Sequence, residues 1–232
     1  SLVFNCLWEG TTDVRASQME TGSLIQYYEN YWRMPVLAKV SGLFSEKKRL
    51  NFTVGAPVYQ YLFPNDSSKL FIEMCNYHII GDSVFLSTNY SNDILVFDSL
   101  LNLINNYKIH SAHTNIGQKK ISFGEDPKKL STLIKTSSHI TGIFWDSYRK
   151  VYYISIYKGT EENLSKEKID FQWILQVCDH NFQLLQEYVM ENSQYSSFCM
   201  FVTEKGLAIR KNNSSENIEL KDKKEVFHVF QF

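Results

Sequence analysis

Side chains able to hold a binding partner gather in one short stretch of the sequence, at His139, Asp146, Tyr148, Arg149 and Tyr152. An arginine presents a planar fork of donors that fits a carboxylate or a phosphate. A tyrosine combines a flat apolar face with a polar tip. We therefore predict that these five residues line a binding surface.

Motifs of the common catalytic chemistries are missing from the sequence. It contains no G-x-S-x-G, G-x-x-x-x-G-K-S/T, G-x-G-x-x-G or H-E-x-x-H pattern. His110 and His113 are close in sequence but have no third metal ligand beside them, and Glu161 and Glu162 lie in a charged loop rather than in a shielded pocket. We predict no catalytic residue, no metal site and no cofactor.

The charge balance argues against a nucleic-acid partner. Lys and Arg total 24 and Asp and Glu total 25, which gives a net charge of -1, whereas a nucleic-acid binder usually carries a basic stripe. No stretch approaches the roughly 20 apolar residues that span a bilayer. Four scattered cysteines form no C-x-x-C pair and are interpreted as buried thiols, although their spacing leaves a disulfide open: Cys6, Cys75, Cys178 and Cys199.

The composition and the local patterns favour strands. Aromatic residues make up 15% of the chain, and aromatic side chains suit a pleated, half-buried surface. Residues 69–109 read as one antiparallel meander of four short strands with polar turns, the size of a propeller blade. Its third strand, 94–97, is apolar at every position, which predicts burial on both faces, as between neighbouring blades.

Similar strands recur toward the C-terminus. Asp98 and Asp179 each end an apolar strand and lie 179 − 98 = 81 positions apart. That distance fits two repeats of about 40 residues, or one repeat with insertions at 111–138 and 158–168. Helices over 99–106 and 183–190 are alternatives, but both lack caps. The other expected strands cover 2–4, 35–40, 49–54, 58–63, 143–145, 151–157, 173–178, 182–190, 198–202, 206–209 and 226–230.

These elements predict one all-β domain over residues 1–232, a β-propeller built of four-stranded antiparallel blades. The chain starts at Ser1 inside an apolar run, so we expect part of the native N-terminus to precede it. In such a fold the cluster described first has a structural interpretation, which we favour: Asp146 caps a tight turn, Arg149 pairs with it, and Tyr152 packs between blades.

The run from Ser138 to Tyr153, SHITGIFWDSYRKVYY, resembles a motif of a six-bladed propeller family called domain of unknown function 4221. Its members, mainly lipoproteins of gut Bacteroidetes, carry Tyr-Asp-Pro-Tyr-Arg-x-x-Tyr-Tyr-Arg at this point. Residues 201–209 and the Phe-rich C-terminus are also similar, and the likeness is best over 69–232. The sequence departs from the motif at Trp145 and Ser147, which replace Tyr and Pro, and at Ile154, where the family often has Arg.

The resemblance implies export and a lipid anchor on the missing N-terminal part, and hence a place in the cell envelope, but no activity. Our first expectation is a non-enzymatic binding or scaffolding module that recognises a protein or a glycan through propeller loops. The alternative is a hydrolase or lyase whose residues come from several blades near the central channel. A third hypothesis is an assembly protein that needs a second chain to complete its ring.

Overall fold

The computed structural model describes residues 2–5, 37–41, 51–54, 75–88, 91–117, 132–133, 135–165, 171–212 and 225–232. The strand expected at 58–63 and the beginning of the meander expected at 69–109 lie outside these residues. The described strands are β1 (Leu2–Asn5), β2 (Leu37–Ser41), β3 (Asn51–Val54), β4 (Cys75–Ile80), β5 (Ser83–Thr88), β6 (Asp93–Phe97), β7 (Leu103–Lys108), β8 (His139–Asp146), β9 (Val151–Tyr157), β10 (Gln172–Cys178), β11 (Leu184–Glu191), β12 (Tyr195–Thr203), β13 (Gly206–Lys211) and β14 (Phe227–Phe230).

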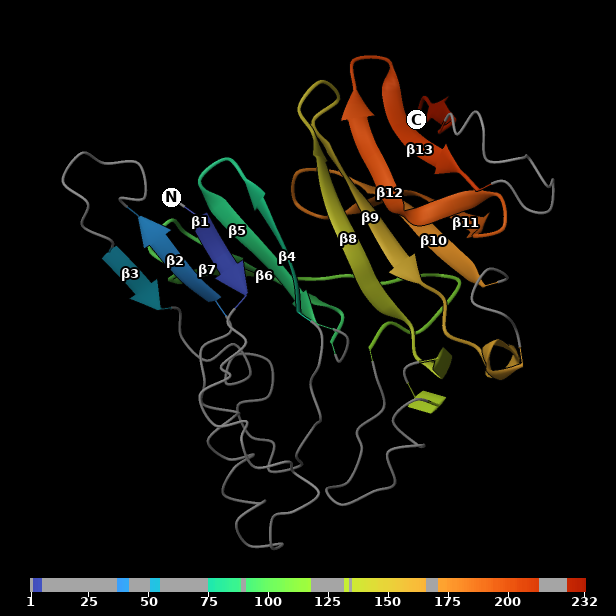
Figure 1. Cartoon of the computed structure of the whole chain (residues 1–232), viewed down its shortest axis with the longest axis horizontal. Coiled ribbons are helices and arrows are strands. Elements are labelled where there is room, and N and C mark those ends of the chain that lie inside the picture. The colour runs from blue at the N-terminus through green and yellow to red at the C-terminus, as the bar shows by residue number, and fades with distance from the viewer. Residues whose placement is uncertain are drawn as a thin grey trace, which may run out of the picture.

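The strands form four antiparallel sheets in chain order, and this confirms the all-β prediction (Figure 1). The first sheet is β1–β3, the second β4–β7, the third β8–β11 and the fourth β12–β14. The second and third sheets are four-stranded meanders, as expected of blades. The helices considered over 99–106 and 183–190 are wrong, because β7 and β11 occupy those positions. No helix in the described part of the chain is long and apolar enough to cross a membrane.

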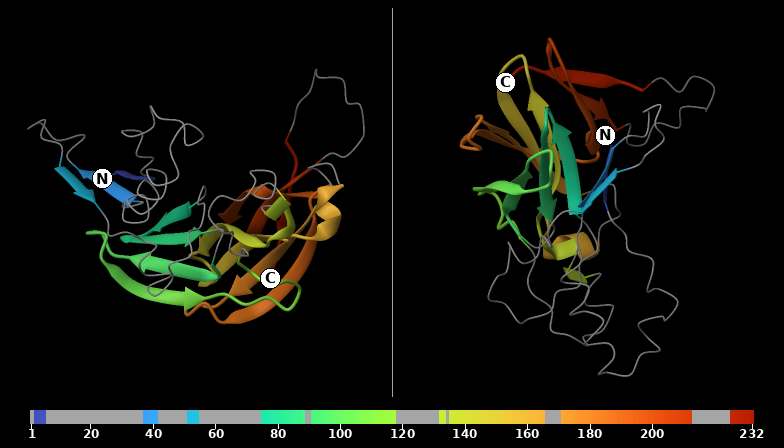
Figure 2. Two further views of the ribbon diagram at one scale, coloured as in Figure 1. Left: turned by 90° about the horizontal axis from the view of Figure 1, so that it is seen from below. Right: turned by 90° about the vertical axis from the view of Figure 1, so that its left-hand side faces the viewer.

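The second, third and fourth sheets pack against one another mainly through their first strands. Strand β8 contacts β4 and β5 on one side and β12 on the other. Figure 2 shows the same succession, with the second, third and fourth sheets following one another through space. Within the described ranges the sheets form a fan and do not close into a ring.

Strand β6 confirms the expectation of burial on both faces, since all five of its residues are buried. Ile94 and Val96 belong to the apolar cluster between the second and third sheets. Leu95 and Phe97 point the other way, into a separate cluster on the far face of the second sheet. Strand β9 shows the same division, with Ile154 and Tyr153 in clusters on opposite faces of the third sheet. The third sheet is therefore covered on both sides.

The turns that follow β6 and β10 have the same structure. Oδ1 of Asp98 accepts hydrogen bonds from the backbone N–H groups of Leu100 and Asn102. Oδ1 of Asp179 accepts the equivalent bonds from Asn181 and Gln183. The next-to-last residue of each turn has a left-handed backbone conformation, with φ of 65° at Leu101 and 60° at Phe182. Because β6 and β10 are the third strands of consecutive sheets, the 81-residue spacing is one repeat with insertions.

The outer edge of β8 is closed by side chains from the second sheet. Nδ2 of Asn76 donates to the backbone oxygen of Ile140 at 2.9 Å. Nε2 of His78 accepts a hydrogen bond from the backbone N–H of Ile143 at 3.2 Å. Two side chains of β4 thus satisfy backbone groups of β8 that a neighbouring strand would otherwise pair with. The same two hydrogen bonds hold the second sheet against the third.

The hairpin between β12 and β13 depends on a glycine. Gly206 has φ of 146°, and a Cβ atom there would collide with the backbone oxygen of Phe230 on β14. Only a residue without a side chain allows β14 to approach the turn this closely.

Candidate functional site

Asp146 ends β8 and organises the turn that leads into β9. Its side chain is fully buried. Oδ1 accepts hydrogen bonds from the backbone N–H groups of Tyr148 and Arg149 at 2.9 and 3.0 Å. Lys150 closes the turn with a left-handed φ of 59°. Short polar side chains that accept from the backbone two residues on are the usual means of fixing such a turn.

Arg149 extends this turn to the neighbouring sheet. Its Nη1 lies 2.9 Å from Oδ2 of Asp146 and also donates to the backbone oxygen of Thr203 at 3.2 Å. Its Nη2 donates to the backbone oxygen of Glu204 at 2.7 Å. Thr203 and Glu204 begin the turn of the β12–β13 hairpin, so one guanidinium group joins the third sheet to the fourth. Every partner named here is an acceptor within the chain itself.

The charge of Asp146 is balanced by these donors. Burial alone raises the pKa of the Asp146 carboxyl, but hydrogen bonds from Arg149, Tyr153 and Tyr148 outweigh it and hold that pKa below its ordinary value. The hydroxyl of Tyr153 donates to Oδ2 of Asp146 at 3.1 Å, and burial together with that hydrogen bond raises the pKa of Tyr153. The carboxylate therefore stays ionised and satisfied.

Tyr152 lies in the core between the second and third sheets. It is 9% exposed, and its ring stacks on Phe182 with 4.3 Å between centroids and 14° between planes. Phe85 of β5 and Trp145 of β8 complete its surroundings. The structural interpretation thus describes the contacts of Asp146, Arg149 and Tyr152, and a binding role for them stays a prediction.

The other two predicted residues lie apart from each other. His139 begins β8, at the opposite end of the strand from Asp146. Its ring packs against Tyr157 and its Nδ1 lies 3.3 Å from the backbone oxygen of Ser137. Burial lowers the pKa of His139, and the Ser137 hydrogen bond opposes that effect. Tyr148, by contrast, is 58% exposed at the tip of the β8–β9 turn.

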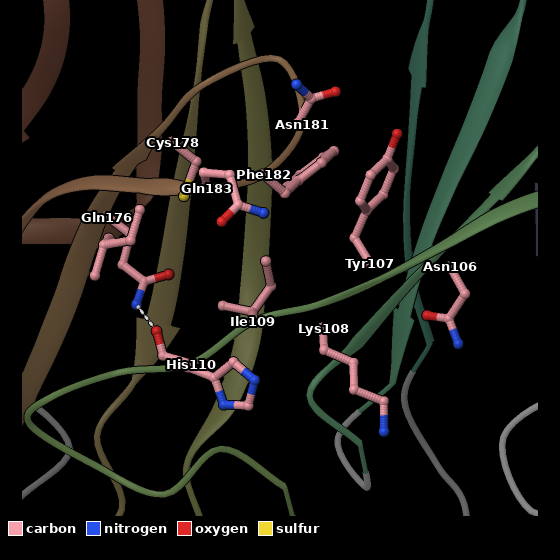
Figure 3. Close-up of a pocket in the computed structure, with 11 residues that line it drawn as sticks. Asn106, Tyr107, Lys108, Ile109, His110, Gln176, Cys178, Asn181, Phe182 and Gln183 are labelled. Carbon is pink, nitrogen blue, oxygen red and sulfur yellow. Dashed lines mark hydrogen bonds between the residues drawn. The ribbon is translucent and has the colours of Figure 1, made fainter.

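The structure also contains a pocket that the sequence analysis missed. It measures about 420 Å³ and lies between β7 of the second sheet and the β10–β11 turn of the third (Figure 3). Gln176 lines it from the middle of β10. One signal could have pointed to this residue: Gln176 interrupts the apolar strand predicted at 173–178, and polar side chains in such strands need partners.

Among the residues that the structure describes, no group of three or more His, Cys, Asp or Glu side chains could hold a metal ion. Cys178 and Cys199 are free thiols. Burial, with smaller contributions from the charges of Asp179 and Glu187, raises the pKa of the Cys178 thiol to about 12. That thiol is therefore protonated and a poor nucleophile.

Comparison with known proteins finds one informative likeness. No protein-family model and no curated protein matches the sequence. A crystal structure of a member of the DUF4221 family from Bacteroides vulgatus superposes on 80% of this chain, with a TM-score of 0.61 and 16% sequence identity. The two proteins share a fold. The present chain spans about half of the DUF4221 structure, 52% of its length.

Proposed function

We propose that this chain is part of a six-bladed β-propeller of the DUF4221 family and acts as a non-enzymatic binding or scaffolding module of the cell envelope. The stacked four-stranded meanders and the shared fold support the propeller. The motif around Asp146 and Arg149 supports the family. The envelope location rests on that resemblance. The module recognises a protein or a glycan with the hairpin turns at one end of its sheets.

One observation carries this proposal: Tyr148 is exposed on a turn that is otherwise immobilised. The turns β4–β5, β8–β9 and β12–β13 lie at the same end of the molecule (Figure 1). The β8–β9 turn is held from inside by Asp146 and tied to the β12–β13 turn by Arg149. An aromatic ring held on a rigid support loses little entropy on binding, and such rings dominate many interfaces.

A matched pair of variants tests the proposal. The wild-type protein is used as bait against envelope extract of its source cells and against a glycan array, and the partner's affinity is then measured. Tyr148→Ala is expected to weaken binding by about tenfold or more, while Ser147→Ala, an exposed neighbour on the same turn, leaves it unchanged. Equal binding by Tyr148→Ala, or turnover of a substrate with no partner found, would overturn the proposal.

A further inference from the structure

The pocket between the second and third sheets has a buried floor and a polar opening. Ile109 and Cys178 form the floor, with 3% and 1% exposure. Asn106, Lys108 and Gln183 are exposed residues at the opening. Its volume of about 420 Å³ falls within the range of roughly 300–1,000 Å³ that is typical of small-molecule sites.

Gln176 brings an unsatisfied acceptor into this pocket. Its side chain is fully buried, and its Nε2 donates to the backbone oxygen of His110 at 2.6 Å and to Oε1 of Glu187 at 2.8 Å. Its Oε1 has no hydrogen-bond partner. In Figure 3 that oxygen points away from the His110 carbonyl, toward the space bordered by Ile109 and Gln183.

The orientation of this amide follows from its partners. A carbonyl and a carboxylate can only accept, so both must face the NH₂ group of Gln176 and not its oxygen. Turning the amide over would place its oxygen against two other acceptors. The oxygen therefore stays directed toward the pocket as a buried acceptor in its wall, and an unpaired buried acceptor destabilises the protein until a donor reaches it.

The remaining lining selects the chemistry of a ligand. A fully ionised anion such as sulfate has no hydrogen to offer to Oε1 of Gln176, and the charge of Lys108 at the opening disfavours an ammonium group. A neutral hydroxyl can donate to that oxygen and also accept from the amide of Gln183, which lies on the same side of the pocket (Figure 3). The ring of Tyr107, which rests on Phe182 at 4.6 Å between centroids, supplies an apolar wall.

We propose that this pocket binds a neutral sugar residue, with one of its hydroxyl groups donating to Oε1 of Gln176. A pyranose ring carries the two surfaces that the pocket requires, hydroxyl groups around its edge and an apolar C–H face for an aromatic wall. This site is separate from the turn that carries Tyr148, so sugar binding here can be tested independently of the function proposed above.

Titration of isotope-labelled protein with the methyl glycosides of glucose, galactose, mannose and N-acetylglucosamine tests the site. At least one glycoside is expected to bind with millimolar affinity and to shift the side-chain amide resonance of Gln176. Sulfate, an anion without a hydrogen to donate, serves as the comparison and is expected to leave that resonance unmoved. If none of the four glycosides moves it, the proposal is wrong.

Two matched variants locate the binding. Gln183→Trp fills the opening from an exposed position and is expected to weaken glycoside binding by about tenfold or more. Gln194→Trp places the same ring on an exposed turn between β11 and β12 and is expected to leave binding unchanged. Gln183→Ala, which removes an amide without adding bulk, is expected to weaken binding less. Full binding by Gln183→Trp, with its fold verified by circular dichroism, would overturn the proposal.

Discussion

The guanidinium group of Arg149 donates a 2.7 Å hydrogen bond to the backbone oxygen of Glu204, on the turn of the adjacent sheet. The same group pairs with the fully buried Asp146 at 2.9 Å. The turn at the end of β8 and the packing of the third sheet on the fourth are therefore stabilised by one side chain, and a change at Arg149 should affect both.

Replacing Arg149 should destabilise the protein. Arg149→Ala leaves the Asp146 carboxylate without its strongest donor and two backbone oxygens without theirs, so we expect the free energy of unfolding to fall by about 1–3 kcal/mol. Arg149→Lys keeps a positive charge but lacks the fork that reaches both turns, so it should recover only part of the loss. Urea unfolding measures both.

The partner of Arg149 supplies a control. Glu204 accepts through its backbone oxygen, so Glu204→Ala preserves the acceptor and should change the unfolding free energy by less than about 0.5 kcal/mol. A large effect of Glu204→Ala would mean that its carboxylate, and not the backbone, is the partner of Arg149.

Tyr152 should matter for packing and not for its hydroxyl group. Tyr152→Ala removes a buried ring that touches Phe85, Trp145 and Phe182, and we expect a loss of about 3–5 kcal/mol in unfolding free energy. Tyr152→Phe keeps the ring and should retain most of the stability and any partner binding. If Tyr152→Phe abolishes partner binding while the protein stays folded, the hydroxyl belongs to the binding surface after all.

Stability should decrease as the pH falls below the ordinary pKa of histidine. Burial lowers the pKa of His78 from 6.5, and its Nε2 must be unprotonated to accept from Ile143. The folded state therefore binds fewer protons than the unfolded chain, so this stability is fully present above pH 6.5 and is lost as the pH falls through the lower folded-state pKa.

Unfolding free energies at pH 7.5 and pH 5.5 check this expectation. His78→Gln should flatten the dependence without removing it, because burial lowers the pKa of His139 in the same direction. The double variant with His139→Gln should be flatter still. An unchanged slope in His78→Gln would show that protonation of His78 is not coupled to folding.

Lys150 offers a stabilising substitution. It is exposed and holds φ of 59°, a conformation that costs most residues roughly 1–2 kcal/mol and costs glycine little. The greater freedom of glycine in the unfolded chain offsets part of this gain, so Lys150→Gly should stabilise the protein by about 0.5–1 kcal/mol. Lys150→Ala keeps the strain and should give no gain in the thermal unfolding midpoint.

Much of the strand arrangement could be predicted because burial on two faces leaves a clear pattern. The unbroken apolar run at 94–97 predicted a strand between two layers, and the structure places Ile94 and Leu95 in different clusters. The likeness of Asp98 and Asp179 was visible, but which of the two repeat lengths applied was not. That choice depends on how many strands the segments at 111–138 and 158–168 contribute, and pairing between distant segments decides it.

The contacts between different sheets could not be predicted from the sequence. The pairing of Arg149 with Asp146 was predicted because the two residues share a turn, whereas its reach to Glu204 joins positions 55 residues apart. The pocket is harder still, because Tyr107 and Gln176 come from different sheets. Only the polar residue within an apolar strand gave any local sign of it.

The side chains of Asn76 and His78 have a further consequence for how the protein behaves in a crowded solution. An edge strand with open backbone groups is a template on which a foreign strand can add, and repeated addition leads to aggregates. Here the backbone oxygen of Ile140 and the backbone N–H of Ile143 are already hydrogen-bonded to side chains of β4, so they cannot pair with a foreign strand. The contact of Asn76 and His78 with β8, which holds two sheets together, therefore also reduces the tendency of this edge to self-associate.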